Sequence, residues 1–144
     1  MSQHFFQQIA HLTDQVNGQY PRPWMTDLSD PTHARIFIVG CSPATPYRVD
    51  QLSHERHLNA LFNMNGENCR TLYREIRNSP SGYRENIDDL TGSLKSQGFH
   101  DLLETNAVCY SVPESAELSR LKNQSGVDRG ILLFSTVFQT IKPR

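Results

Sequence analysis

The segment Arg-Ile-Phe-Ile-Val-Gly at residues 35–40 decides the fold of this 144-residue chain. Its four consecutive apolar residues, three of them β-branched, predict a strand that is buried on both faces, as in the interior of a parallel sheet. The sequence Gly-Cys-Ser-Pro at residues 40–43 then predicts a tight turn at the carboxyl end of this strand. A second strand is expected over residues 102–110.

Apolar residues at helical spacing predict amphipathic helices before, between and after the two strands. The expected helices cover residues 2–16, 54–62, 69–77, 79–98 and 127–141. In the last helix the buried stripe is expected to consist of Val127, Ile131, Phe134, Phe138 and Ile141.

The helix over residues 79–98 has a sequence signal at its start. Ser79 is expected to be its N-cap and Pro80 its first helical residue. Its inward side chains are expected to be Ile87, Leu90 and Leu94.

Strands that alternate with helices predict an α/β fold in which the strands pair in parallel. Residues 1–144 are expected to form one domain, to which residues 1–34 contribute a helix and a wrapping loop anchored by Trp24. Two strands make a poor sheet. Three explanations are open: further strands lie in segments that look irregular, the chain is a truncated form of a longer domain, or a homodimer completes the sheet.

The composition limits the class of protein. The net charge of -1, from 14 Lys+Arg and 15 Asp+Glu, excludes a globally basic surface, so any nucleic-acid surface must be a local patch. Three widely spaced cysteines without a C-x-x-C motif indicate a reducing compartment, and we expect a cytoplasmic protein. Because neither a signal peptide nor a membrane-spanning apolar stretch is visible, no membrane contact is expected.

Candidate ligand-binding residues lie at the two strand ends, because ligands of open α/β sheets bind outside the carboxyl ends of the strands. Glu104 and Asn106 share one face of the second strand. The Asn106 amide offers one acceptor and two donors in a plane, which suits the edge of a nucleobase. The alternatives are that the first turn merely ends a strand and that Asn106 caps a neighbouring loop.

Two sequence motifs, one after the other along the chain, resemble motifs of the uracil-DNA glycosylase superfamily. Ile-Val-Gly-Cys-Ser-Pro-Ala-Thr at residues 38–45 resembles its first motif, a buried strand that runs into Gly-x-Asp/Asn-Pro. Leu-Glu-Thr-Asn-Ala-Val at residues 103–108 resembles the strand with its base-reading Asn. The Pro-Ala-Thr turn, the Ser-Pro helix start at residues 79–80 and Phe-x-x-x-Phe-x-x-Ile-Lys-Pro at residues 134–143 are similar to an uncharacterised bacterial branch. The resemblance covers residues 35–143.

The resemblance implies a three-layer α/β/α sandwich with a mostly parallel central sheet and a pocket for a base that is extruded from DNA. In that pocket Asn106 would pair with the edge of the base, while Phe62 or Tyr47 would stack on its face. The implied activity is that of a DNA base N-glycosylase in base excision repair, acting on single-stranded DNA or on a flipped base. No cofactor and no metal ion are implied.

The first turn departs from the superfamily pattern. Gly40, Cys41 and Pro43 would form the turn under the base. Ser42 would stand where the superfamily keeps the Asp or Asn that activates water, and a hydroxyl is a poor general base. The late His-Pro-Ser or Asn-Pro-Ser motif does not follow Ile141. Two alternatives to the glycosylase are therefore open: an inactive remnant that binds nucleic acid or a partner, and a nucleoside or nucleotide hydrolase.

Two polar clusters have alternative interpretations. Arg70, Arg74 and Arg77 form a basic stripe that could bind phosphates, or a solvent-exposed face paired with Glu67 and Glu75. The segment His-Glu-Arg-His at residues 54–57 lacks the spacing of a zinc site, and a solvated helix face is the preferred interpretation.

Overall fold

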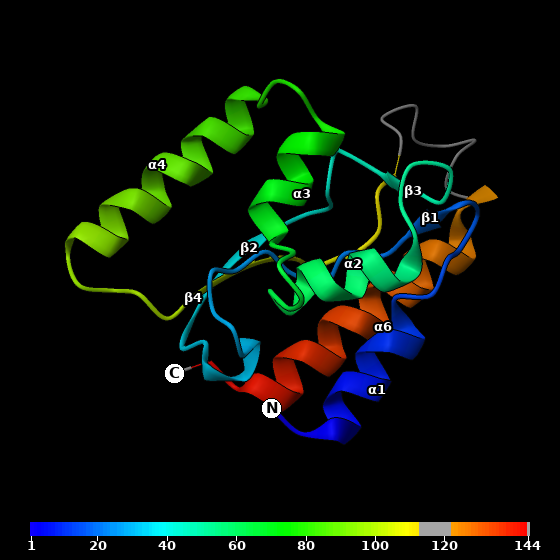
Figure 1. Ribbon diagram of the computed structural model, residues 1–144, viewed down its shortest axis with the longest axis horizontal. Helices are drawn as coiled ribbons and strands as arrows, with labels where there is room; N and C mark the ends of the chain where they lie inside the picture. The colour runs from blue at the N-terminus through cyan, green and yellow to red at the C-terminus, as the bar shows by residue number, and fades with distance from the viewer. Residues whose placement is uncertain (113–121, 144) are drawn as a thin grey trace.

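The computed structural model describes residues 1–112 and 122–143, a mixed α/β arrangement of helices around a small parallel sheet (Figure 1). The helices are α1 (Gln3–Leu12), η1 (Pro31–His33, a 3-10 helix), α2 (His54–Leu61), α3 (Cys69–Ile76), α4 (Gly82–Ser96) and α6 (Gln124–Ile141). The strands are β1 (Gln19–Tyr20), β2 (Ile36–Gly40), β3 (Tyr47–Arg48) and β4 (Leu102–Asn106). None of these described helices is long and apolar enough to cross a membrane.

The strands β2 and β4 pair in parallel, as the sequence predicts. Their register runs from Ile36 opposite Leu102 to Gly40 opposite Asn106. On its other side β4 exchanges hydrogen bonds with the backbone of Met25 in the wrapping loop. Some irregular segments do hold extra strands, but β1 and β3 form a separate antiparallel pair and leave the β2–β4 sheet at two strands.

The expectation that β2 is buried on both faces is wrong. Its first three residues are only half-buried, and Val39 is 49% exposed. The physical reason is the position of β2, because within the described residues no strand pairs with its outer edge. A homodimer in which a second copy of the chain covers that edge stays a prediction.

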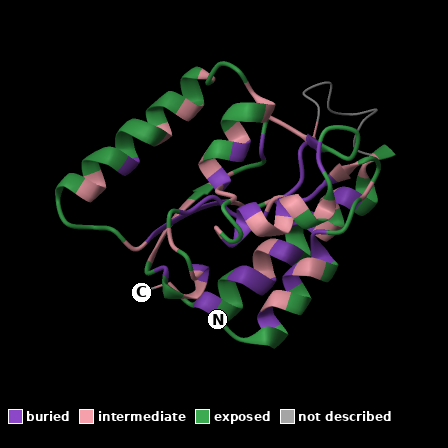
Figure 2. Ribbon diagram, in the orientation of Figure 1, coloured by how far each residue is buried: buried purple, intermediate pink, exposed green. Residues whose placement is uncertain are grey.

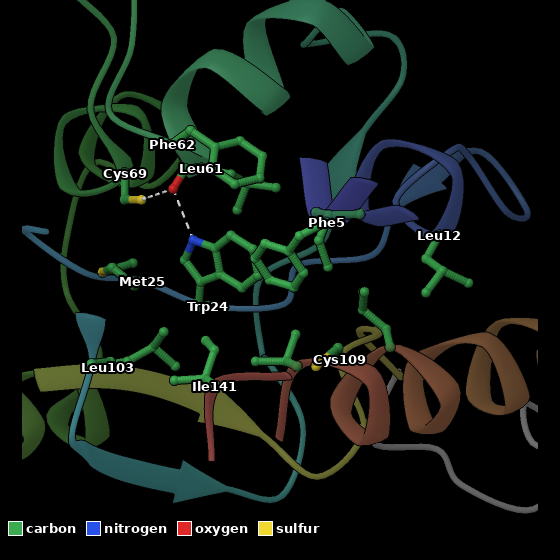
Figure 3. Packing of buried hydrophobic residues seen from close by; sticks show 14 residues of the cluster. Phe5, Leu12, Trp24, Met25, Leu61, Phe62, Cys69, Leu103, Cys109 and Ile141 are labelled. Atoms are coloured by element: carbon green, nitrogen blue, oxygen red, sulfur yellow. Dashed lines mark hydrogen bonds between the residues drawn. The ribbon is translucent and has the colours of Figure 1, made fainter. Parts of the chain in front are cut away.

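The main core lies between β4 and the helices α1, α2 and α6 (Figure 3). Leu103 of β4 packs into it, together with Leu133 and Val137 of α6. Trp24 anchors the wrapping loop as predicted: its ring is buried, and its indole Nε1 donates a 2.8 Å hydrogen bond to the carbonyl of Leu61. A large aromatic ring with one polar atom is stable in such a place only when that atom finds a partner.

The predicted buried stripe of α6 is wrong in part. Phe138 is 48% exposed and Ile131 is similarly exposed. The buried face instead includes Gly126 and Gly130, since these glycines allow the helix to approach the fully buried Tyr110. Ile141 is buried as predicted, but hydrophobicity alone missed the part of the buried face that the glycines form, because small residues make the closest backbone contacts.

The start and the inner face of α4 also differ from expectation. The N-cap is Ser81, whose side chain accepts a hydrogen bond from the Arg84 amide, and not Ser79. Only Thr91 of this helix is buried, while Ile87 and Leu94 are half-buried and Leu90 is exposed. The reason is visible in Figures 1 and 2, where α4 stands away from the core and is mostly exposed.

We expect Gly126→Ala to lower the free energy of unfolding by about 1–3 kcal/mol through overpacking. A Cβ atom at position 126 would lie 2.3 Å from the ring of Tyr110, which has no room to move. Urea unfolding would measure the change. Gly92→Ala is the matched control: nothing lies within 4 Å of its added Cβ, and the higher helix propensity of alanine should stabilise by about 1 kcal/mol. Equal effects of the two variants would contradict the close contact.

Candidate functional site

The register of the parallel sheet brings Gly40 and Asn106 side by side at the carboxyl ends of β2 and β4. A Cβ atom built on Gly40 would lie 2.7 Å from Asn106 Oδ1 and 2.7 Å from the hydroxyl of Tyr83. The three residues therefore converge on one spot, and only a glycine leaves room for the other two side chains. The sequence placed Gly40 and Asn106 at strand ends, and the structure brings them together.

The side-chain amide of Asn106 has no hydrogen-bond partner among residues 1–112 and 122–143, although the residue is half-buried. Its main-chain carbonyl accepts a 3.2 Å hydrogen bond from Cys109 Sγ, which helps to close the turn after β4. The alternative that Asn106 caps a neighbouring loop finds no hydrogen bond to support it in the described chain. Neither polar atom of this amide is among the buried, unpaired side-chain atoms of the described residues, so the amide reaches solvent and is accessible to a ligand.

The turn after β2 exposes Cys41 and Ser42 and buries Pro43. The backbone amides of Ala107 and Val108 donate to the carbonyls of Gly40 and Cys41, so the two strand ends are joined beyond the sheet. Ser42 makes no side-chain hydrogen bond to any residue that the structure describes. Its hydroxyl can orient a water molecule, but no described side chain is hydrogen-bonded to it as a general base.

Phe62 and Tyr47 do not lie where a base-stacking residue is needed. Phe62 is fully buried against Trp24 and Phe6, with ring centroids 5.4 Å and 4.9 Å away. Tyr47 is buried in a second core cluster, and the Arg22 guanidinium covers its ring at 4.7 Å. Both rings are buried among other side chains, which speaks against the expected stacking role.

Tyr83 is the aromatic residue at the strand ends, and the sequence interpretation missed it. It is 61% exposed and stands in the first turn of α4. A signal was available: α4 directly precedes β4, and a crossover helix runs back along the sheet, so its first turn lies at the carboxyl ends of the strands.

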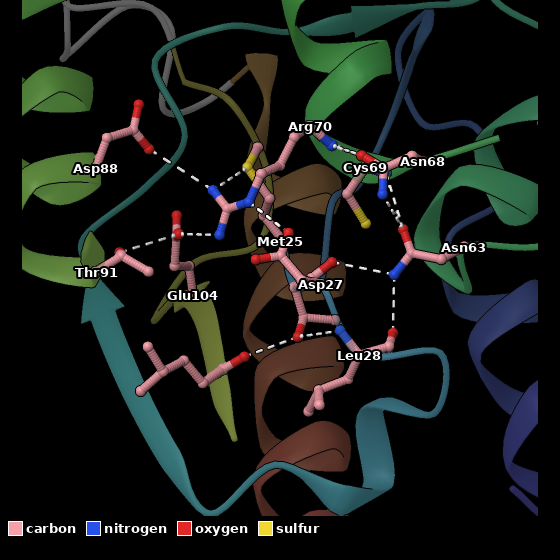
Figure 4. Close-up of polar contacts among 12 residues, drawn as sticks. Met25, Asp27, Leu28, Asn63, Asn68, Cys69, Arg70, Asp88, Thr91 and Glu104 are labelled. Atoms are coloured by element: carbon pink, nitrogen blue, oxygen red, sulfur yellow. Dashed lines mark hydrogen bonds and ion pairs between the residues drawn. The ribbon is translucent and has the colours of Figure 1, made fainter. Parts of the chain in front are cut away.

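A buried carboxylate holds α3 and α4 against β4 (Figure 4). Glu104 accepts hydrogen bonds from Arg70 of α3 at 2.9 Å and forms an ion pair with Arg84 of α4 at 2.6 Å. Burial opposes the charge of Arg84, but its bonds to Glu104 and Asp88 outweigh that effect and raise its pKa. The charged network is therefore stable inside a partly dry site because each charge has a partner.

Two further carboxylates lie near the guanidinium of Arg70. The guanidinium also binds Asp27 at 2.7 Å and approaches Asp88 at 3.6 Å. Partial burial disfavours the charge of Asp27, yet its bonds from Lys95 and Arg70 outweigh this effect and lower its pKa. Arg70 is thus occupied by three carboxylates and is not free to bind a phosphate.

A cleft of about 310 Å³ lies between α3 and α4, next to this network. Arg74 and Arg77 reach it, whereas Gly40 and Asn106 do not line it. The expected partners of the arginine stripe are engaged elsewhere, since Glu67 and Glu75 both pair with Arg56 of α2. The interpretation of the stripe as a face paired with these two glutamates is therefore wrong.

The histidines of α2 are not a solvated face. His57 is fully buried, and its Nε2 lies 2.9 Å from the carbonyl of Pro21. His54 stacks on Tyr20 and contacts the hydroxyl of Thr13. In the described part of the chain, no group of three His, Cys, Asp or Glu side chains could hold a metal ion.

Comparisons of the chain with protein-family models, curated proteins and solved structures found no match. The resemblance to the uracil-DNA glycosylase superfamily therefore stays a prediction.

We expect Glu104→Gln to lower the free energy of unfolding by about 3 kcal/mol, because it leaves two partly buried guanidinium groups without their common charge. Asp101→Asn, which removes the exposed partner of Arg35, is the control and should change stability little. Urea unfolding with far-ultraviolet circular dichroism would measure both. A loss no larger than that of Asp101→Asn would contradict the anchoring role.

We expect the stability of the protein to fall as the pH drops from 6.5 toward 3, partly because of His57. Burial lowers the pKa of His57 to about 3 in the folded state, against 6.5 for a free histidine. The unfolded chain therefore takes up a proton that the folded chain excludes, which costs up to about 1.4 kcal/mol per pH unit. His57→Gln should flatten this pH dependence in urea unfolding, whereas the exposed control His100→Gln should not.

Proposed function

We propose that this chain is a uracil-DNA glycosylase-like protein that binds an extruded nucleobase at Gly40, Tyr83 and Asn106. The observation that supports this is the side-chain amide of Asn106, which has no hydrogen-bond partner among residues 1–112 and 122–143 and lies beside a glycine at the ends of two parallel strands. The proposed ligand is a base in DNA, presented as a single strand or flipped out of a duplex.

Each of the three residues has a distinct part in the proposal. The amide of Asn106 supplies a donor and an acceptor in one plane, which matches the Watson–Crick edge of a base. Gly40 has no side chain, which leaves room for the Asn106 amide and the Tyr83 hydroxyl to meet at the end of the sheet. The exposed ring of Tyr83 offers a face on which the base can stack, in place of Phe62 or Tyr47.

The arrangement of the helices supports the proposed three-layer sandwich. Leu103 of β4 packs with α1 and α6, whereas Glu104, on the opposite face of the strand, binds α3 and α4. Helices thus contact both faces of β4.

Base binding is the part of this function that the geometry supports best, and hydrolysis of the N-glycosidic bond is the second candidate. Ser42 is exposed at the same turn and can hold the attacking water. Since its hydroxyl has no described base beside it, and a lost transition-state stabiliser typically costs about 10²–10³ in rate, we expect slow hydrolysis or none. The inactive remnant and the nucleoside hydrolase remain the rivals.

The test is binding and cleavage of fluorescein-labelled single-stranded oligonucleotides that contain uracil, hypoxanthine or xanthine. We expect Asn106→Ala to weaken binding to the modified oligonucleotide at least about tenfold, the worth of one lost hydrogen bond to a buried group. Asn86→Ala, an exposed amide on α4, is the matched control and should bind like the unmodified chain. Fluorescence anisotropy measures binding, and scission after alkali measures glycosylase activity.

The outcomes separate the candidates. Scission that Asn106→Ala abolishes identifies a glycosylase, whereas binding without scission identifies the inactive remnant. Release of a base from free nucleosides but not from the oligonucleotides identifies the hydrolase. Equal binding by the unmodified chain, Asn106→Ala and Asn86→Ala for all three bases would overturn the proposed function.

A second variant probes the shape of the site. Gly40→Ala places a methyl group 2.7 Å from both Asn106 Oδ1 and the Tyr83 hydroxyl, so both side chains must shift. We expect base binding to be lost while the unfolding midpoint changes little, because the Tyr83 hydroxyl is the free end of an exposed side chain. Binding equal to that of the Gly92→Ala control would exclude Gly40 from the contact surface.

A further inference from the structure

We propose that the cleft between α3 and α4 is a binding site for a phosphate group, held by Arg74 and Arg77. The cleft has a volume of about 310 Å³, at the lower end of the range for ligand sites. Its lining contains more arginine than any other residue type. The lining residues are Met25, Arg70, Tyr73, Arg74, Arg77, Asn78, Pro80, Arg84 and Asp88.

The charges of the lining do not cancel. Arg70 and Arg84 are paired with Glu104 and Asp88, which neutralise the inner part of the cleft. Arg74 and Arg77 form no ion pair with any of the described residues. Asp88 is the one carboxylate of the lining. The outer part of the cleft is therefore positive, and it favours an anion.

Arg77 is held in position before a ligand arrives. Its Nε donates to the carbonyl of Ser79 at 3.0 Å, and its NH1 donates to Thr45 Oγ1 at 2.9 Å. The remaining N–H groups of its guanidinium are free to bind oxygen atoms. A guanidinium whose rotamer is already set loses less entropy on binding a phosphate, and its fork of donors fits two phosphate oxygens.

The start of α4 adds a favourable field. This 15-residue helix begins next to Pro80, which lines the cleft. The first N–H groups of a helix and its dipole attract anions. The helix start only reinforces a site that the two arginines define.

The cleft adjoins the proposed base site, which suggests one phosphorylated ligand across both. Tyr83 at the strand ends and Arg84 in the cleft are consecutive residues. Arg77 is tied to Thr45, in the loop that follows the first turn. The pairing of the phosphate with a base rests on the proposed function, whereas the phosphate site itself does not. The shared ligand chemistry is a phosphate ester, from a free nucleotide or from the backbone of single-stranded DNA.

The test compares the unmodified chain with the double variant Arg74→Gln/Arg77→Gln by isothermal titration calorimetry at low salt. The probes are pyrophosphate, deoxyuridine, dUMP and a single-stranded 12-nucleotide oligomer. We expect the double variant to bind pyrophosphate and at least one of the two phosphate esters at least tenfold more weakly, with deoxyuridine unchanged. Arg35→Gln/Arg129→Gln is the control, because it removes the same charge away from the cleft and should have no effect.

The outcomes distinguish the two proposals. If deoxyuridine fails to bind but pyrophosphate binding depends on Arg74 and Arg77, the phosphate site is supported and the base site is not. Weaker binding of dUMP alone identifies a nucleotide site. Weaker binding of the oligomer, with a salt slope reduced by about 1.4 for two lost contacts, identifies a DNA backbone site. Equal binding of every phosphorylated probe by the double variant and its control would overturn the proposal.

Discussion

The buried carboxylate of Glu104 is the interaction on which the arrangement of this molecule depends. It stands on β4 of the two-stranded sheet and binds Arg70 of α3 and Arg84 of α4. Removing a charge of this kind from water is costly, and the two guanidinium groups, with a hydrogen bond from the Thr91 hydroxyl, offset that cost. Without them α4 would lose its main tie, because Thr91 is its one buried side chain.

This constraint also explains the positions of the two proposed binding surfaces. Asn106 follows Glu104 by two residues, so both side chains point to the same face of β4. Glu104 draws Arg84 onto the strand, and the preceding Tyr83 is thereby carried to the end of the sheet beside Gly40. Long charged side chains line the space between α3 and α4 and do not pack together as apolar side chains would. A cleft therefore remains between the two helices.

Glycines set the closest approaches in the rest of the structure. Gly126 and Gly130 let α6 lie against Tyr110, and Gly40 makes room for the Asn106 amide and the Tyr83 hydroxyl. At each of these glycines a side chain would collide with the neighbouring group. The same property that packs α6 onto the core lets Asn106 and Tyr83 approach the backbone at the strand ends.

The sequence by itself determined the helices, the two parallel strands and the position of Asn106 at a strand end, because local periodicity and turn residues encode these features. It could not determine which side of α6 is buried, that β2 is an edge strand, or that Phe62 belongs to the core, since these depend on what lies across the chain. Only the tertiary structure decided that Arg56 pairs with the two glutamates and that Arg74 and Arg77 have no ion pair within the described ranges. Which charged groups form ion pairs depends on the distances between them in the folded chain, and the spacing of residues along the sequence does not give those distances.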